Sequence, residues 1–255
     1  GATLPAVITG VFLLACGACA LNHYQERTTD ALMPRTAGRP IPSGDIRPVA
    51  ALRFSLVLIG LGIACLAAAG APAVPLLGLA AVLWYNGLYT WLKARHAFAA
   101  IPGALAGAIP PAIGWTAGGG DFDARLAAIS FFFFMWQVPH FLIHQHAFGK
   151  EYEQIRRPSL TAVFTGAQLD RLTFQWLLAA AVSIQVVICY GLIRSSLIHL
   201  SLIATSLWFA ARGLALIGRR PPNYRGIFMS TNYFMLLAML FIALDRLPRW
   251  LGWAG

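Results

Sequence analysis

Charged residues are scarce in this chain, and acidic ones are the rarest. Only 11% of its 255 residues are charged, and nine Asp and Glu stand against nineteen Lys and Arg, which gives a net charge of +10. In a soluble protein this excess would suggest nucleic acid as a partner. Because 58% of the residues are hydrophobic and the mean hydropathy is +0.68, the composition instead favours a polytopic membrane protein that binds no nucleic acid.

Cysteine is also scarce, and the chain shows no repeat, low-complexity tract or soluble domain. The four cysteines all lie in apolar segments, and no spacing between them is typical of a zinc site. They are Cys16, Cys19, Cys65 and Cys189. We therefore expect one polytopic membrane domain over residues 1–255, with the cysteines as small buried packing residues.

Long apolar runs predict eight membrane spans. In lipid every backbone polar group must be satisfied internally, so these runs indicate an all-α helix bundle, and each is long enough for a hydrocarbon core of about 30 Å. The loops after the first, third, fifth and seventh spans carry most Lys and Arg, which places that side in the cytoplasm. The expected spans are 4–25, 49–69, 72–91, 97–118, 125–147, 171–193, 197–217 and 226–247.

The end of the first span carries the most informative residues. Asn22, Glu26 and Asp30 follow one another at intervals of four, so on a helix they share one face. Two carboxylates with an amide oxygen nearby form a plausible site for Mg²⁺, and Arg35 and Arg39 follow closely, as expected for a bound diphosphate. The alternative is a membrane helix end with capping acids and arginines placed by topology.

A family resemblance adds to this interpretation. N-x-x-x-E-x-x-x-D followed by M-x-R-T-x-x-R-P resembles the first acidic motif of UbiA-type intramembrane prenyltransferases, and most of all that of the protohaem IX farnesyltransferases, the haem O synthases. The usual central Asp is Glu26 here. The resemblance implies a UbiA-like helix bundle. Because the family's acidic motif normally ends the second helix of that bundle, the resemblance also implies a ninth helix before these eight.

Two further stretches resemble the same family. The third span carries four polar residues on one face, namely Asn86, Tyr89, Thr90 and Lys93. The alternative is that the Tyr lies at the membrane interface and the Lys snorkels toward water without binding a substrate. In the family this Lys contacts diphosphate, with the Tyr beside it. In the fifth span His140 and His144 lie beside Pro139 in a stretch similar to the family's P-H-F. They suggest a haem contact, while the alternative is histidines that pack between helices.

The loop after the fifth span stands where the family has D-Y-x-x-A-G-x-P-M. Here Glu151 and Tyr152 match its start, so Glu151 is a candidate metal ligand. The family's Ala-Gly becomes Ile155–Arg156, followed by Arg157. This departure puts a second metal in doubt and suggests that Arg156 and Arg157 neutralise diphosphate directly.

Together these resemblances imply a Mg²⁺-dependent enzyme. It would transfer a farnesyl group from farnesyl diphosphate to a vinyl group of haem B, with addition of water, and release haem O and pyrophosphate. Asn22, Glu26, Asp30 and Lys93 would be its catalytic residues. We expect the protein to lie in the bilayer of a bacterial-type inner membrane and to have a haem A synthase as a partner. The alternatives are prenylation of another aromatic, quinone-precursor acceptor, and a non-catalytic carrier of haem or lipid diphosphate.

Overall fold

The computed structural model describes residues 3–218 and 221–250, with side chains up to Arg246 in the second stretch. Among these residues every regular element is a helix, as the apolar runs predicted. The chain groups into two compact units: Gly1–Phe122 with Lys150–Ser159, and Asp123–Gly149 with Leu160–Gly255. The expectation of a single domain over 1–255 stays a prediction.

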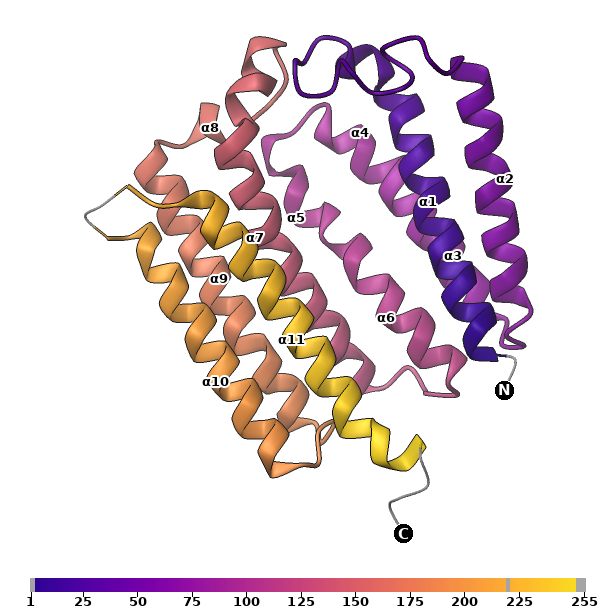
Figure 1. Cartoon of the computed structure of the whole chain (residues 1–255), viewed down its shortest axis with the longest axis vertical. Helices are drawn as coiled ribbons and strands as arrows, with labels where there is room; N and C mark the ends of the chain where they lie inside the picture. The colour runs from indigo at the N-terminus through magenta and orange to yellow at the C-terminus, as the bar shows by residue number, and fades with distance from the viewer. Residues whose placement is uncertain (1–2, 219–220, 251–255) are drawn as a thin grey trace. The chain divides into compact units, whose positions relative to one another are not determined.

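The first unit is built around an antiparallel pair of long helices (Figure 1). Its core cluster joins Val7 and Leu14 to Leu66, Val82 and Ile113, residues from four different helices. The elements are α1 (Thr3–Asp30), α2 (Pro48–Ala67), α3 (Ala73–Val82), the π-helix η1 (Leu83–Tyr89), α4 (Thr90–Lys93), η2 (Ala97–Ala99), α5 (Ala100–Gly103) and α6 (Leu105–Ala117).

The second unit packs three of its long helices against one another through aromatic rings. Phe209 stacks on Phe234 with centroids 4.3 Å apart, and Phe132 meets Phe234 edge-on at 5.9 Å. All three rings are fully buried. The elements are α7 (Ala124–Gln154), whose last turns belong to the first unit, then α8 (Leu160–Val163), α9 (Gly166–Cys189), α10 (Ser196–Gly213), η3 (Leu214–Leu216) and α11 (Tyr224–Trp250).

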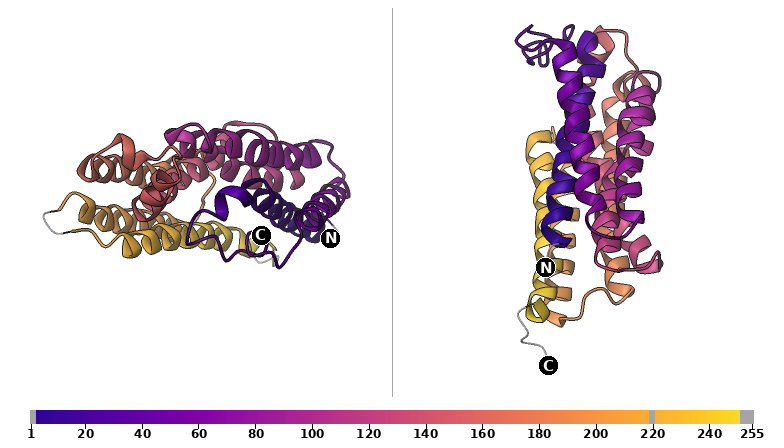
Figure 2. Two further views of the ribbon diagram at one scale, coloured as in Figure 1. Left: turned by 90° about the horizontal axis from the view of Figure 1, so that it is seen from above. Right: turned by 90° about the vertical axis from the view of Figure 1, so that its right-hand side faces the viewer.

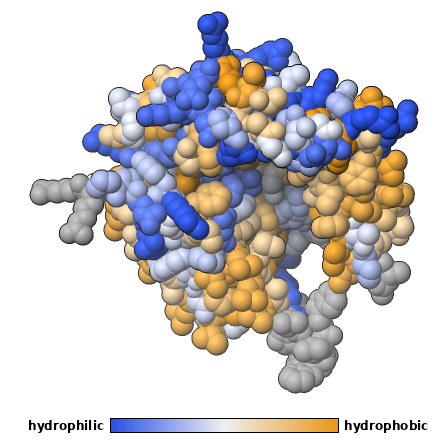
Figure 3. Space-filling view, turned by 45° about the horizontal axis from the view of Figure 1, so that its top comes forward, coloured by the Kyte–Doolittle hydropathy of each residue, from blue (hydrophilic) through white to orange (hydrophobic). Residues whose placement is uncertain are grey.

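Eight stretches of helix are long and apolar enough to cross a membrane, which agrees with the eight predicted spans. Large hydrophobic side chains such as Phe12, Phe54 and Leu207 are exposed on the flanks of these helices. In Figure 3 hydrophilic residues gather toward the top of the view, and hydrophobic ones cover much of the surface below them. Exposed apolar surface of this extent is stable in lipid and not in water. The protein is therefore a multi-pass membrane protein.

Two of the predicted spans differ from the structure in a way that matters for the site. The first helix was expected to end near residue 25 and continues to Asp30, so the whole acidic face is helical. The third span was expected to be a regular helix, but its second half is the π-helix Leu83–Tyr89.

Glycine lets α1 and α2 approach closely. A Cβ placed on Gly17 would lie 2.9 Å from the backbone nitrogen of Ile59, and one on Gly62 would lie 2.9 Å from the backbone nitrogen of Leu14. The two helices lie side by side in Figures 1 and 2. Small residues at such contacts are the usual means by which membrane helices pack, and here they fix α1 against its neighbour.

We predict that Gly62→Ala destabilises the protein by about 1–3 kcal/mol, because its methyl group meets backbone atoms that cannot give way. Thermal unfolding in detergent measures this. Gly60→Ala on the same helix is the matched control, since a Cβ there has nothing within 4 Å, and it should change stability by less than about 1 kcal/mol. Equal unfolding temperatures for the two variants would contradict the close-packing account.

Candidate functional site

The acidic face of α1 is largely buried at the C-terminal end of this helix. Asn22 and Asp30 are buried and Glu26 is mostly so, with 11% of its side chain exposed. The predicted spacing of four residues therefore does place all three on one helix. Buried carboxylates are costly unless they are paired, so their partners decide what the site can do.

The partner of Glu26 is Lys93. Lys93 Nζ lies 2.9 Å from Glu26 Oε2, and one turn earlier Asn22 Nδ2 donates to Thr90 Oγ1 at 3.1 Å. A third contact follows below, where Asn86 Nδ2 donates to the carbonyl of Ala18 at 2.9 Å. The polar face of the third span thus meets α1 at three successive turns, which brings the predicted residues Asn22, Glu26 and Lys93 together.

The partner of Asp30 is Arg39. Arg39 Nη1 donates to Asp30 Oδ2 at 2.7 Å, and Thr36 Oγ1 donates to the backbone carbonyl of Asp30 at 2.9 Å. Met33 and Thr36 are buried, so this loop folds back over the end of α1. The M-x-R-T-x-x-R-P stretch therefore has a direct structural purpose, which is to bring an arginine to the second carboxylate.

The segment 150–159 lies against the same end of α1. Arg35 Nε lies 3.6 Å from Glu151 Oε2, and Arg157 Nη2 donates to Thr29 Oγ1 at 2.5 Å. Lys93 Nζ lies 5.9 Å from the ring centre of Tyr152, which is buried, a distance at which the ring attracts a cation. The predicted residues of the second acidic motif thus lie in one unit with α1 and Arg35.

The end of helix α7 contains the residue at which the sequence departs from the family pattern. The N–H of Arg156 bonds the carbonyl of Glu153 at 2.9 Å, and the N–H of Arg157 bonds that of Tyr152 at 2.8 Å. These two bonds make a Schellman motif, whose C′ residue takes the left-handed conformation and is usually glycine. Arg156 has φ = 57°. The glycine of the family pattern is therefore replaced by a strained arginine.

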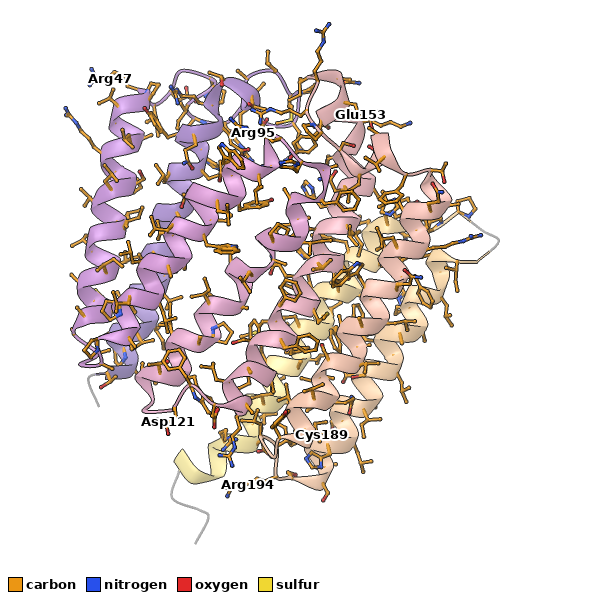
Figure 4. The ribbon with its side chains drawn as sticks, turned by 180° about the vertical axis from the view of Figure 1, so that it is seen from behind. Arg47, Arg95, Asp121, Glu153, Cys189 and Arg194 are labelled. Carbon is orange, nitrogen blue, oxygen red and sulfur yellow. The ribbon has the colours of Figure 1, made fainter. Side chains whose placement is uncertain are left out.

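Charge is unevenly distributed between the two ends of this unit. Arg47, Arg95 and Glu153 lie at the end that holds the site, and Asp121 lies at the opposite end (Figure 4). The loops 68–72 and 118–122 at the opposite end contain neither Lys nor Arg. This asymmetry follows the positive-inside rule.

The donors on α1 suit a divalent cation. Among the described residues no three His, Cys, Asp or Glu side chains gather into one metal site, so Glu151 does not join Glu26 and Asp30 in a single cluster. Mg²⁺, however, is usually held by only one or two carboxylates together with substrate phosphates. Glu26, Asp30 and the amide oxygen of Asn22 provide such a set, once Lys93 and Arg39 release the carboxylates.

The predicted histidines belong to the second unit. The His140 ring lies 4.7 Å from that of Phe228 and 5.3 Å from that of Trp136, and its Nδ1 is buried with no hydrogen-bond partner among the described residues. His144 packs on Phe148 at 4.6 Å. Their aromatic surroundings suit a flat ring as well as simple packing. A haem contact by either histidine stays a prediction.

Tyr89, another predicted residue, packs its ring against Gly103 and lies 5.7 Å from the ring of Tyr85. Its part in substrate binding also stays a prediction. Two further residues of this site were not predicted from the sequence: Gln25, which exchanges hydrogen bonds with Asn86, and Thr29, which accepts a hydrogen bond from Arg157. Both lie three or seven residues from Asn22, a helical spacing that marks them as neighbours of the acidic face.

Known proteins are similar to this chain in sequence and in fold. The model of the UbiA prenyltransferase family matches residues 1–244. The chain belongs to this family. A protein named protoheme IX farnesyltransferase from Geobacter sulfurreducens is 39% identical over 247 residues, covering 94% of this chain and 87% of that protein. Another of the same name, from Nitratidesulfovibrio vulgaris, is 38% identical over 239 residues, covering 92% and 81%.

Two solved structures are similar in fold. A UbiA homologue from Archaeoglobus fulgidus, bound to GPP and Mg²⁺, matches with a TM-score of 0.69 at 17% identity, over 95% of this chain and 87% of that one. A structure of digeranylgeranylglyceryl phosphate synthase matches with a TM-score of 0.69 at 14% identity, over 95% and 84%. The predicted UbiA-like helical fold is confirmed. The ninth helix stays a prediction.

We predict that Arg156→Gly stabilises this UbiA family member by about 1 kcal/mol, because glycine adopts the left-handed conformation without the Cβ clash. Thermal unfolding and hydrogen exchange at the end of α7 measure the gain. Arg156→Ala removes the same guanidinium but keeps the clash, and it should give no gain. If the alanine variant were as stable as the glycine variant, the backbone would not be the cause.

Proposed function

We propose that this protein transfers a farnesyl group from farnesyl diphosphate to a vinyl group of haem B. The observation that supports the diphosphate half is the paired face of α1, where Glu26 meets Lys93 at 2.9 Å and Asp30 meets Arg39 at 2.7 Å. Two carboxylates and two cations in one buried place suit a metal diphosphate, since the acids hold the metal and the cations neutralise phosphate oxygens. The acceptor is supported by the names of the bacterial relatives.

The reaction balances as an ionisation followed by capture. The C–O bond of the allylic diphosphate breaks and its electron pair leaves with pyrophosphate. The vinyl π electrons form the new C–C bond, and the cation left beside the porphyrin takes up water and loses a proton. Farnesyl diphosphate, haem B and water thus give haem O and pyrophosphate.

The chain's own residues have distinct parts in this scheme. Asn22, Glu26 and Asp30 would hold Mg²⁺, which when bound offsets the charge of the departing pyrophosphate. Lys93, Arg39 and Arg35 bind phosphate oxygens, and Arg156 and Arg157 add charge from the loop, where Glu151 is a further ligand for a metal. The apolar helices enclose the prenyl chain and keep water from the allylic cation.

The proposal includes the protein's orientation and setting. The end of the first unit with the site carries its loop arginines, whereas the opposite loops carry none. We therefore place the site on the cytoplasmic side of a bacterial inner membrane. Delivery of the product to a haem A synthase is part of the proposal through family resemblance alone.

The direct test supplies the full chain in liposomes with farnesyl diphosphate, Mg²⁺ and haem B. We expect haem O by mass spectrometry, one pyrophosphate released per haem O, and neither product when Mg²⁺ is chelated. Prenylation of an aromatic quinone precursor in place of haem B would overturn the acceptor. Binding of haem or farnesyl diphosphate without pyrophosphate release would indicate a carrier.

We predict that Lys93→Met lowers the rate of pyrophosphate release by about 10²–10³-fold, because it removes a fixed cation from the leaving group. Lys150→Met is the matched control, since Lys150 is exposed and has no part in the proposed site. Its rate should stay at the wild-type value. Thermal unfolding of both variants shows whether they fold, and a folded Lys93→Met protein with the wild-type rate would contradict the assignment.

A further inference from the structure

Thr90 stands behind Asn22 and fixes how its amide is turned. The Thr90 hydroxyl donates its single hydrogen to the carbonyl of Tyr85 at 2.9 Å. Its oxygen can therefore only accept from Asn22, whose Nδ2 lies 3.1 Å away. The amide nitrogen of Asn22 must face Thr90, and its oxygen must face the other way. The side-chain hydrogen bond of Asn22 to Thr90 thus uses its nitrogen, and its oxygen is left for another partner.

The π-helix is what brings Thr90 to this carbonyl. The backbone N–H of Thr90 also bonds Tyr85, five residues back, so both donors of Thr90 reach one carbonyl. In an α-helix they would be directed to Asn86, four residues back. Asn86, Thr90 and Lys93 all contact α1, so the π turn redirects the two donors of Thr90 while these three residues keep facing the same neighbour. Single π turns within helices occur frequently at functional sites.

Asn86 joins the π-helix to α1 by further hydrogen bonds. Asn86, the buried residue of the π-helix, donates through Nδ2 to the carbonyl of Ala18 and to Gln25 Oε1, while Gln25 Nε2 donates to the backbone carbonyl of Asn86. Three hydrogen bonds thus hold the π-helix to α1 just below Asn22. Thr90 is consequently fixed in place before any substrate binds.

We propose that Thr90 is a positioning residue, which turns the amide oxygen of Asn22 toward the cation and diphosphate bound at Glu26 and Asp30. This inference rests on the proposed function, because it needs a metal diphosphate on the acidic face of α1. Thr90 itself touches neither metal nor substrate in this scheme and acts through Asn22. Groups that orient a metal ligand in this way usually contribute about 10–100-fold to metal affinity or activity.

Thr90→Val tests the proposal, because valine keeps the shape and removes the hydroxyl. The readout is the affinity of the purified full chain for Mn²⁺, measured by electron paramagnetic resonance with the unreactive analogue farnesyl thiodiphosphate. We expect Thr90→Val to bind Mn²⁺ about 10-fold more weakly and Thr90→Ser to restore the wild-type affinity. Thr116→Val is the matched control, since the Thr116 hydroxyl is buried without a hydrogen-bond partner, and its affinity should equal that of wild type.

A double variant separates positioning from simple folding. In the Asn22→Ala background Thr90→Val should cause no further loss of Mn²⁺ affinity, because nothing remains for Thr90 to orient. The same loss in both backgrounds, or no loss in either, would overturn the proposal.

Binding and turnover also distinguish the two proposals. A wild-type protein that binds Mn²⁺ and the analogue as expected but makes no haem O would refute the proposed function and leave the role of Thr90 intact. A protein that makes haem O while Thr90→Val keeps full Mn²⁺ affinity would refute the role of Thr90 alone. A wild-type chain that binds no Mn²⁺ would refute both.

Discussion

Everything at this site depends on how α1 is joined to the third membrane span. Contacts at three successive turns connect them: Asn86 with Ala18, Thr90 with Asn22, and Lys93 with Glu26. A carboxylate inside a membrane protein is stable only when a cation or a set of donors compensates it. The pairing of Glu26 with Lys93 therefore permits the acidic face, and the hydrogen bonds below it keep both groups in register.

The same pairing links stability to chemistry. In the structure each of the two α1 carboxylates has one basic partner, Lys93 or Arg39, so the face carries little net charge. In the proposed function a metal diphosphate would replace each internal pair with a new one, because it brings both positive and negative charges. The carboxylates and cations would then stay paired in the bound complex, as buried charges require.

Much of this was predictable from sequence, for identifiable reasons. The spacing of Asn22, Glu26 and Asp30 is a local property of a helix, and apolar run length predicts eight spans. The π-helix at Leu83–Tyr89 was not predictable, because its extra residue is stabilised by contacts with α1 that are distant in sequence. Likewise the sequence at Arg156 shows only a departure from a pattern, because the positive φ of this residue depends on how α7 ends.

The glycine contacts between α1 and α2 restrict how these two helices can move. With Gly17 and Gly62 backed by main-chain atoms of the opposite helix, α1 cannot slide or rotate on α2 without steric conflict. The two helices therefore behave as one rigid unit, and any rearrangement around the acidic face falls to the elements packed against it. Larger side chains on the exposed flanks leave the contact between α1 and α2 unchanged, whereas the contact itself tolerates almost no growth in side-chain volume.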